Sequence, residues 1–153
     1  MRGRYGEDKL IYGGLEVLLV EDIATDAELA CRAVSRCGAE VFVAKDGAMA
    51  LDYLHGVGAY SEQKRKPRPA MILLDLSLPK VSGLEVLRQI KKDEQTKHIP
   101  VVVQSSLREE AYVAESYRLG ANSFILKPSN SDEFVTVFEQ VARYWLSLNQ
   151  PPV

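Results

Sequence analysis

Five short apolar runs recur along the chain, and each one ends at polar residues. They cover residues 17–20, 41–44, 70–75, 100–104 and 123–126. Apolar runs of this length without polar alternation are typical of strands that are buried on both faces. Such strands belong to parallel sheets, which carry helices on each side. The pattern therefore predicts five central strands.

Between these runs, apolar residues recur at helical spacing, as at Ile23, Ala27, Ala30 and Val34. One helix is predicted to follow each strand, over about residues 23–37, 47–54, 84–93, 106–119 and 131–148. Strict alternation of strand and helix predicts a doubly wound α/β domain. With right-handed crossovers, the expected architecture is flavodoxin-like (βα)5, with strand order 2-1-3-4-5.

The predicted helix ends carry recognisable signals. Ser/Thr-x-x-Glu patterns, which can form capping boxes, begin at Thr25, Ser82 and Ser106. Gly38 and Gly120 stand where two helices are expected to stop.

Composition places the chain among ordinary globular proteins. It has 153 residues, 46% hydrophobic and 26% charged, with a formal net charge of −2. Residues 15–148 are expected to form one domain, with a flexible arm over 1–14 and a short tail over 149–153. The small net charge favours neither nucleic acid nor an anionic membrane as a partner. No apolar stretch approaches membrane-spanning length, so we expect a cytoplasmic protein.

Candidate chemistry gathers where the predicted strands end. Glu21 and Asp22 follow the first strand, Asp75 ends the third, Ser105 the fourth and Lys127 the fifth. In the expected order these ends meet at the switch point of the sheet, where such folds bind ligands. Three carboxylates ~5 Å apart would repel by roughly 3 kcal/mol per pair at an effective dielectric of ~20. A cation should offset this repulsion, and an all-oxygen ligand set suits Mg²⁺.

These groups together suggest phosphoryl transfer. The Lys127 ammonium, the Ser105 hydroxyl and a metal around Asp75 would bind the oxygens of a phosphoryl group in transfer. Asp75 would be the nucleophile that forms an aspartyl phosphate. Taken singly, an acidic pair or a serine after a strand usually caps a helix, and Lys-Pro usually makes a turn. Their joint occurrence at four strand ends favours a site.

The same residues resemble a known family, the response-regulator receiver domain of two-component signalling. The motifs that carry the resemblance are Val-Glu-Asp at 20–22, Leu-Leu-Asp-Leu-x-Leu-Pro at 73–79, Ser-Ser at 105–106 and Lys-Pro at 127–128. A narrower resemblance is to the stand-alone regulators paired with phytochromes. It rests on a long loop before the third strand and on the segments 99–103, 119–122 and 144–146.

The resemblance implies a role for each matching residue. Asp75 would accept a phosphoryl group from a sensor histidine kinase, for which a phytochrome is the candidate. Glu21, Asp22, Asp75 and the main-chain carbonyl of Ser77 would hold Mg²⁺. Lys127 would contact the phosphoryl group, and the Lys127–Pro128 bond would be cis.

The resemblance also implies how the protein responds to phosphorylation and how fast the aspartyl phosphate is hydrolysed. Ser105 would swing towards the phosphoryl group and Phe124 would follow, although Phe124 lacks the hydroxyl of the commoner tyrosine. Ser77 and Leu107 stand at the two positions that flank the attacking water in this family. Leu107 cannot hydrogen-bond water, so self-dephosphorylation is expected to be slow.

Output is expected to be a changed protein surface, because the chain ends after the fifth predicted helix. That helix is apolar around most of its circumference, which predicts a homodimer through it and its neighbouring elements. One apolar stripe along this predicted helix comprises Phe134, Phe138, Val141, Trp145 and Leu148.

Three other functions remain open at this point. A pseudo-receiver would use the same scaffold for binding without being phosphorylated. A phosphatase of the haloacid dehalogenase type also uses a strand-end aspartate, but it places a second Asp two residues later, where this chain has Ser77. A nucleotide-binding flavodoxin relative is disfavoured because the turn at 21–23 has no phosphate-cradling glycine.

Overall fold

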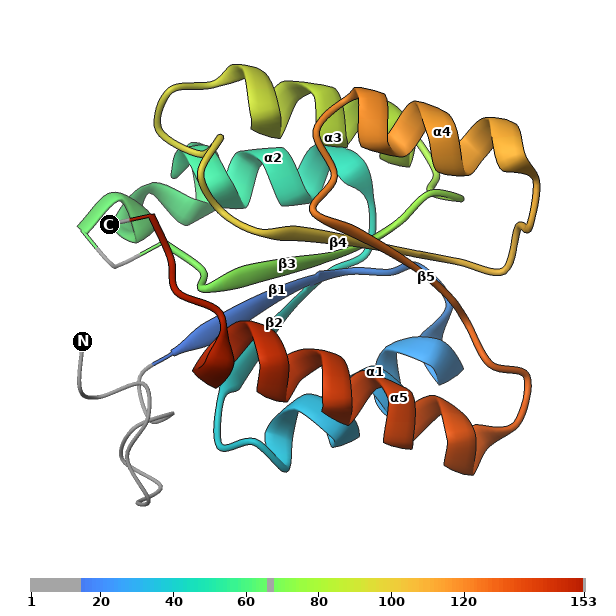
Figure 1. Ribbon diagram of the computed structural model, residues 1–153. Coiled ribbons are helices and arrows are strands. Elements are labelled where there is room, and N and C mark those ends of the chain that lie inside the picture. Colours follow the sequence, from blue (N-terminus) through green and yellow to red (C-terminus); the bar gives the residue numbers. More distant parts are fainter. Residues whose placement is uncertain (1–14, 66–67, 153) are drawn as a thin grey trace.

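The computed structural model describes residues 15–65 and 68–152, and the arm expected over 1–14 lies outside these residues. Five parallel strands form one sheet in the order β2-β1-β3-β4-β5, which confirms the predicted flavodoxin-like topology (Figure 1). The strands are β1 (Glu16–Val20), β2 (Glu40–Ala44), β3 (Met71–Asp75), β4 (Val101–Ser105) and β5 (Ser123–Leu126). All four neighbouring pairs are parallel.

Helices cover both faces of the sheet. They are α1 (Ala24–Ser35), α2 (Gly47–His55), α3 (Gly83–Lys92), α4 (Glu110–Arg118) and α5 (Ser131–Arg143). A 3₁₀ segment, η3 (Gly58–Arg65), follows α2. One core lies between the sheet and α1 and α5, and the other between the sheet and α2 and α3, with α4 contributing at its edge (Figure 1).

Strand burial explains why the apolar runs located the sheet so well. Every residue of β3 and of β4 is buried, and alternate side chains enter the two cores. Asp75 is the last residue of β3 and Ser105 the last of β4. Parallel strands end at one edge, so both side chains lie at the carboxyl edge of the sheet.

Two of the predicted capping boxes are wrong and one is confirmed in part. Ser82 caps α3, since its hydroxyl accepts a hydrogen bond from the Glu85 N–H at 3.2 Å. Thr25 instead lies inside the first turn of α1, because that helix begins one residue earlier, at Ala24. The helix predicted from Ser106 begins only at Glu110, because the Ser105 hydroxyl accepts a bond from the Leu107 N–H and holds the intervening segment as a loop.

The loop between β3 and α3 packs tightly against both neighbouring helices. A Cβ on Gly83 would lie 2.4 Å from the Asp75 carbonyl oxygen and 2.5 Å from the Leu76 Cα. A Cβ on Gly47 would lie 2.5 Å from the Val81 carbonyl oxygen. Glycine is therefore required for these helices to begin directly against the loop that carries Asp75.

The last predicted helix is continuous but changes pitch. After α5 the chain makes a π-helical turn, η4 (Tyr144–Leu148), in which the Asn149 N–H bonds the Tyr144 carbonyl at 2.7 Å. This turn leaves Tyr144 47% and Leu148 64% exposed, while Leu146 stays buried in the core.

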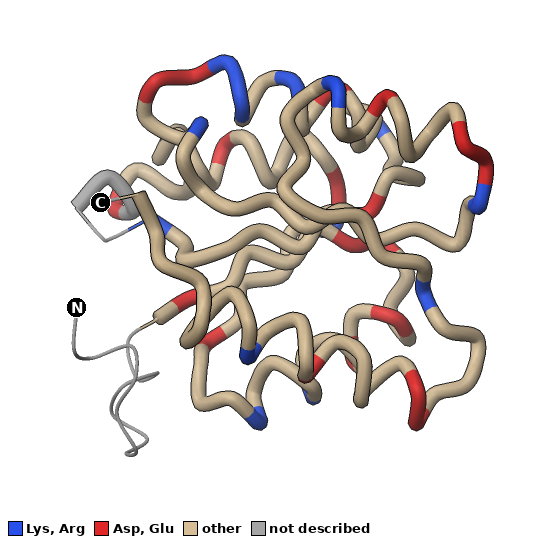
Figure 2. Tube along the Cα trace, in the orientation of Figure 1, with Lys and Arg blue, Asp and Glu red and all other residues tan. Residues whose placement is uncertain are grey.

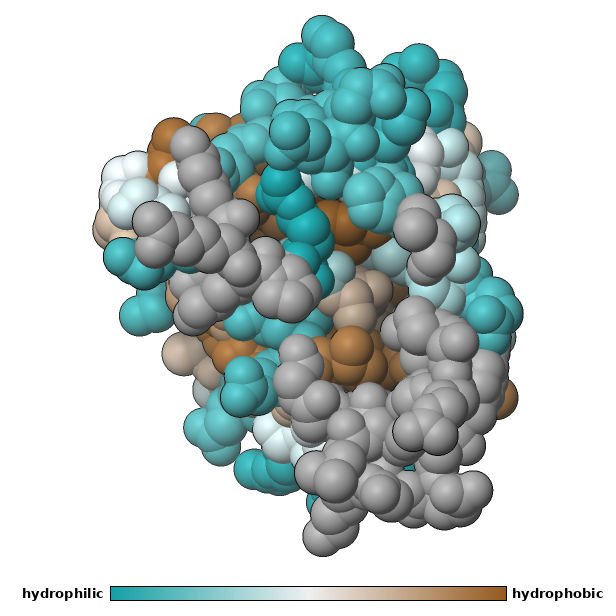
Figure 3. Space-filling view, turned by 90° about the vertical axis from the view of Figure 1, so that its left-hand side faces the viewer, coloured by the Kyte–Doolittle hydropathy of each residue, from teal (hydrophilic) through white to brown (hydrophobic). Residues whose placement is uncertain are grey.

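Charge and polarity are distributed as expected for a folded domain in water. The strands are largely free of charged residues except near their ends, and charges of both signs lie along the helices and loops (Figure 2). From the side where the strands begin, hydrophilic residues cover much of the surface and hydrophobic residues appear between them (Figure 3). Among the described residues, no helix is both long and apolar enough to cross a membrane.

Candidate functional site

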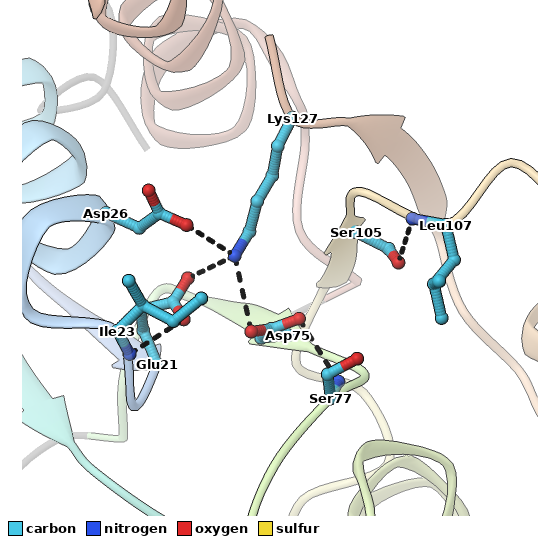
Figure 4. Close-up of polar contacts among 8 residues, drawn as sticks. All are labelled: Glu21, Ile23, Asp26, Asp75, Ser77, Ser105, Leu107 and Lys127. Carbon is cyan, nitrogen blue, oxygen red and sulfur yellow. Dashed lines mark hydrogen bonds and ion pairs between the residues drawn. The ribbon is translucent and has the colours of Figure 1, made fainter. Parts of the chain in front are cut away.

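Asp75 is held in a fixed position at the carboxyl edge of the sheet. Asp75 is 2% exposed, and its Oδ1 accepts a hydrogen bond from the Ser77 N–H at 3.2 Å. The preceding residues of β3 are fully buried and pair with β1 and β4 on either side, so packing and strand pairing restrain the backbone beneath the carboxylate. The other oxygen, Oδ2, is directed at Lys127 (Figure 4).

Two further acids lie beside Asp75. One carboxylate oxygen from each of Glu21, Asp22 and Asp75 falls within a group whose members are at most 4.8 Å apart. Glu21 is 1% exposed, whereas Asp22 is exposed. Burial, followed by the hydrogen bond and charge of Asp75, raises the pKa of Glu21 to about 8. Burial and the neighbouring Asp75 carboxylate therefore disfavour ionisation of Glu21.

Lys127 joins the acids from the other side of the site. Its ammonium nitrogen lies 2.7 Å from Glu21 Oε1, 2.9 Å from Asp26 Oδ2 and 3.3 Å from Asp75 Oδ2 (Figure 4). Its side chain is only 7% exposed. Burial alone would lower its pKa, but the bonds to Glu21 and Asp26 and the charge of Asp75 hold the pKa above its usual value.

The donor set fits a hard divalent cation. Glu21, Asp22 and Asp75 offer only oxygen ligands, which Mg²⁺ and similar ions prefer, and no histidine or cysteine of the described residues joins the group. The single ammonium of Lys127 faces three carboxylates, those of Glu21, Asp26 and Asp75, so the local charge is negative. A divalent cation would relieve this imbalance.

Of the five predicted strand-end groups, the structure brings the carboxylates of Glu21, Asp22 and Asp75 and the ammonium of Lys127 together. The fifth group, the Ser105 hydroxyl, lies beside them without bonding to them. Ser105 is buried, but its hydroxyl accepts a bond from the Leu107 N–H at 3.0 Å rather than bonding Asp75 (Figure 4). Phe124 is half-buried and packs on the core beneath α2 and α3. The Lys127–Pro128 bond is trans, so the cis expectation is wrong; Lys127 reaches the acids with the intrinsically favoured isomer.

Sequence reasoning missed two residues near the site. Asp26, in the first turn of α1, pairs with Lys127 across 101 positions of sequence. Gln104, next to Ser105 on β4, is fully buried, and neither polar atom of its amide has a hydrogen-bond partner among the described residues. A polar residue inside an apolar run was the available signal for Gln104, whereas nothing local marks Asp26.

Two cavities lie away from these acids. They measure about 340 and 410 Å³ and adjoin His55, near the starts of β3 and β4. Their linings include Arg68, Arg88 and Asp93, and neither contains a residue of the acidic group.

Comparisons with known proteins identify this arrangement. The response regulator receiver domain family matches residues 17–139. The probable methanogenesis regulatory protein FilR2 of Methanothrix harundinacea (strain 6Ac) is 38% identical over 138 residues, covering 89% of this chain and 86% of FilR2. The response regulator Rcp1 of Synechocystis sp. is 36% identical over 132 residues, covering 85% of this chain and 88% of Rcp1.

Solved structures give the same result. The phosphorylated cyanobacterial phytochrome response regulator RcpA superposes with a TM-score of 0.86 at 36% identity, covering 92% of this chain and all of RcpA. Rcp1 in its Mn²⁺-bound form superposes with a TM-score of 0.83 at 34% identity, covering 91% of this chain and 99% of that structure.

Proposed function

Because this chain belongs to the response regulator receiver domain family, we propose that Asp75 accepts a phosphoryl group from a sensor histidine kinase in a Mg²⁺-dependent reaction. The observation that carries the proposal is the contact of the Asp75 carboxylate with Lys127, 3.3 Å away, beside the acids Glu21 and Asp22. The chain is related to phytochrome response regulators, whose member RcpA has been solved in phosphorylated form.

In the proposed reaction, a carboxylate oxygen of Asp75 forms a bond to phosphorus. The phosphorus–nitrogen bond of the kinase phosphohistidine breaks, and its electron pair returns to the histidine nitrogen. Glu21, Asp22, Asp75 and the Ser77 carbonyl would hold Mg²⁺, which when bound offsets negative charge on the acids and on the transferring group. The buried end of β3 would hold the nucleophile in place during attack.

Lys127 and Ser105 act on the transferred group. The Lys127 ammonium contributes a positive charge beside the phosphoryl oxygens, at a position where little water competes. The Ser105 hydroxyl would leave the Leu107 N–H and donate to a phosphoryl oxygen instead. Phe124, one strand away, would then follow as the side chain that changes the surface.

The kinase partner is proposed to be a phytochrome, and the reaction to take place in the cytoplasm. Support comes from the likeness to RcpA, which is a cyanobacterial phytochrome response regulator. Phosphotransfer from a purified phytochrome kinase, timed against transfer from unrelated kinases, tests this partner. We expect phosphotransfer from the phytochrome to be about ten times faster than from the unrelated kinases. Equal rates would contradict the proposal of a phytochrome partner.

Labelling by acetyl phosphate tests the phosphoacceptor assignment without a kinase. We expect Mg²⁺-dependent incorporation of one phosphoryl group, loss of it in Asp75→Asn, and full labelling of Asp132→Asn, an exposed aspartate on α5. An unlabelled wild-type chain would indicate a pseudo-receiver. Steady turnover of a phosphomonoester would instead indicate a phosphatase.

The exposed end of the last helix supports a homodimer. Tyr144 and Leu148 are exposed large hydrophobic residues on η4, directly after α5. A second copy packed on this end and on neighbouring elements would cover them. Light scattering at tens of micromolar should show a dimer that Leu148→Glu weakens and that Thr136→Glu, at an exposed polar position of α5, leaves intact. A wild-type monomer under these conditions contradicts the proposal.

A further inference from the structure

Lys127 has a partner that lies outside the group of acids suited to a metal. Asp26 Oδ2 accepts a hydrogen bond from the Lys127 ammonium at 2.9 Å, compared with 3.3 Å for Asp75 Oδ2. Asp26 comes from α1, whereas Glu21 and Asp75 come from the ends of β1 and β3. In Figure 4 its carboxylate approaches the ammonium from the α1 side of the site.

The three carboxylates around Lys127 differ in what the proposed reaction requires of them. Glu21 would bind the metal ion with its carboxylate, and the Asp75 carboxylate would become an acyl phosphate on phosphorylation. Asp26 is not in the metal group and takes no part in bond formation. Among the described residues, Asp26 is therefore the one carboxylate partner of the Lys127 ammonium that can persist unchanged throughout the reaction.

The burial of the Asp26–Lys127 ion pair and the fixed backbone of Lys127 both strengthen the hold of Asp26 on the ammonium. The Lys127 side chain is 7% exposed and that of Asp26 is 24% exposed, so water screens the pair only partly. The base of the lysine is also fixed, because the Lys127 N–H bonds the Ser105 carbonyl at 2.9 Å at the edge of the sheet. With the backbone held by β4, the acceptor on α1 restrains the direction of the flexible four-carbon stem.

We propose that Asp26 is a positioning residue, which holds the Lys127 ammonium on the α1 side of Asp75 while the phosphoryl group enters between Asp75 and the ammonium. The inference rests on the proposed phosphoacceptor function. Asp26 acts through Lys127 and touches no reacting atom itself. Without it, Glu21 and Asp75 would be the remaining carboxylate partners of the ammonium, and nothing on α1 would hold the ammonium as the phosphoryl group enters.

A simpler role for Asp26 is to stabilise the start of α1. An acid in the first turn interacts favourably with the helix dipole, and α1 has no side-chain cap. Glu28 provides a control for the loss of one negative charge, because it lies on the same helix, is exposed and pairs with Arg32 at 3.4 Å rather than with Lys127. A role at the helix start is separated by the double-mutant cycle below, since that role would remain without Lys127. Loss of Asp26 and loss of Glu28 both remove one acid from α1.

The first test measures the rate of labelling by acetyl phosphate at saturating Mg²⁺. We expect Asp26→Ala to lower the rate about tenfold, the lower end of what one charge-assisted hydrogen bond contributes. Asp26→Asn, which keeps an acceptor oxygen, should fall between Asp26→Ala and the wild type. Glu28→Ala should match the wild type. Equal rates for Asp26→Ala and Glu28→Ala would overturn the inference.

A double-mutant cycle tests whether Asp26 acts through Lys127. In a Lys127→Ala background, Asp26→Ala should change the labelling rate by less than about twofold, because its target has been removed. A full tenfold loss in that background would show that Asp26 acts by another route and would overturn the inference.

A measurement without phosphorylation separates this inference from the proposed function. In metal-free protein, NMR of the Lys127 ammonium should show slow proton exchange with water in the wild type and in Glu28→Ala. Exchange should become at least about fivefold faster in Asp26→Ala, where one N–H loses its acceptor. Unchanged exchange overturns the positioning role even if Asp75 is labelled, whereas faster exchange in a chain that cannot be labelled would reject only the phosphoacceptor function.

Discussion

At the scale of single residues, Lys91 shows how burial changes an ordinary surface charge. Its ammonium donates to the Lys97 carbonyl at 3.0 Å, the Ile99 carbonyl at 2.8 Å and the Asn122 side-chain oxygen at 2.9 Å. These acceptors are all neutral. Burial lowers the pKa of Lys91 to about 8 from an ordinary value of 10.5.

This lowered pKa predicts a pH-dependent stability. Between about pH 8 and 10.5 the unfolded chain keeps the Lys91 proton that the folded chain has lost, so the free energy of unfolding should rise with pH. Other groups titrate in the same range, so the measured quantity is the difference between wild type and Lys91→Met in urea unfolding. That difference should grow in favour of the wild type from pH 8 to 10. A difference that stays constant over this range would show that the amine stays charged in the folded chain.

Gln104 gives a second prediction at this scale. Its amide is fully buried, and neither Nε2 nor Oε1 bonds a described residue of the protein. Replacing a buried polar group that lacks partners by an apolar side chain of similar shape removes a desolvation cost. Gln104→Leu should therefore leave the free energy of unfolding unchanged or raise it by up to about 1 kcal/mol. A loss above about 1 kcal/mol in urea unfolding would show that the amide makes bonds through buried water.

Leu107 sets the predicted lifetime of the phosphorylated state. Its side chain is half-buried beside Ser105 and has no group that can orient water. We expect the wild-type acyl phosphate to last minutes to hours, and Leu107→Asn to shorten this by about tenfold, within the range that a water-positioning side chain contributes. Loss of label after removal of acetyl phosphate measures both. A wild-type lifetime of seconds would contradict the prediction.

At the scale of elements, the contact of α3 with the end of β3 is the most demanding feature. Gly83→Ala would push a methyl group against the Asp75 carbonyl oxygen and the Leu76 backbone, and neither can yield as a flexible side chain could. We expect a loss of about 1–3 kcal/mol in the free energy of unfolding together with slower labelling of Asp75, because the loop that carries the nucleophile must shift.

Ser82→Ala is the control for this substitution. It removes the cap of the same helix, at a cost of about 1 kcal/mol, without adding an atom near β3. Its labelling rate should therefore stay at the wild-type value. Equal labelling rates for Gly83→Ala and Ser82→Ala would show that the loop absorbs the extra methyl group elsewhere.

Elements could be predicted from the sequence where burial dictates the pattern, and less well where local hydrogen bonds compete. The strands stand out because both faces of β3 and β4 are covered, which requires unbroken apolar runs. Helix starts are harder to predict, because a Ser/Thr-x-x-Glu pattern is only one way to bond the first N–H groups. At α1 the Ile23 N–H bonds the Glu21 carboxylate instead, so the pattern at Thr25 is not used.

At the scale of the whole molecule, the candidate site could be predicted because topology alone brings strand ends together. Glu21, Asp75 and Lys127 lie far apart in sequence, yet the strand order predicts their meeting. Asp26 could not be predicted in this way, because its contact depends on how α1 is oriented and how far the Lys127 side chain extends. Such contacts are set by three-dimensional packing, which no periodicity along the chain records.

Metal binding should stabilise the entire fold, because the acids that would hold the ion come from the ends of two adjacent strands, β1 and β3. A ligand that binds only the folded state stabilises it by about 2.7 kcal/mol at a concentration one hundred times its Kd. We expect Mg²⁺ to raise the midpoint of thermal unfolding of the wild type. Asp22→Asn should lose most of this shift, because Asp22 contributes one of the three carboxylates of the group.

A matched substitution distinguishes binding of Mg²⁺ at the acidic group from general screening of the negative charge of the protein. Asp52 is an exposed aspartate on α2, outside the acidic group, so Asp52→Asn removes the same charge from the molecule without removing a candidate ligand. It should keep the full Mg²⁺-dependent shift, and an equal ionic strength of NaCl should produce little shift in any variant. If Asp22→Asn and Asp52→Asn respond to Mg²⁺ alike, the ion acts on overall charge rather than at this site. That result would remove the electrostatic basis for phosphorylation of Asp75.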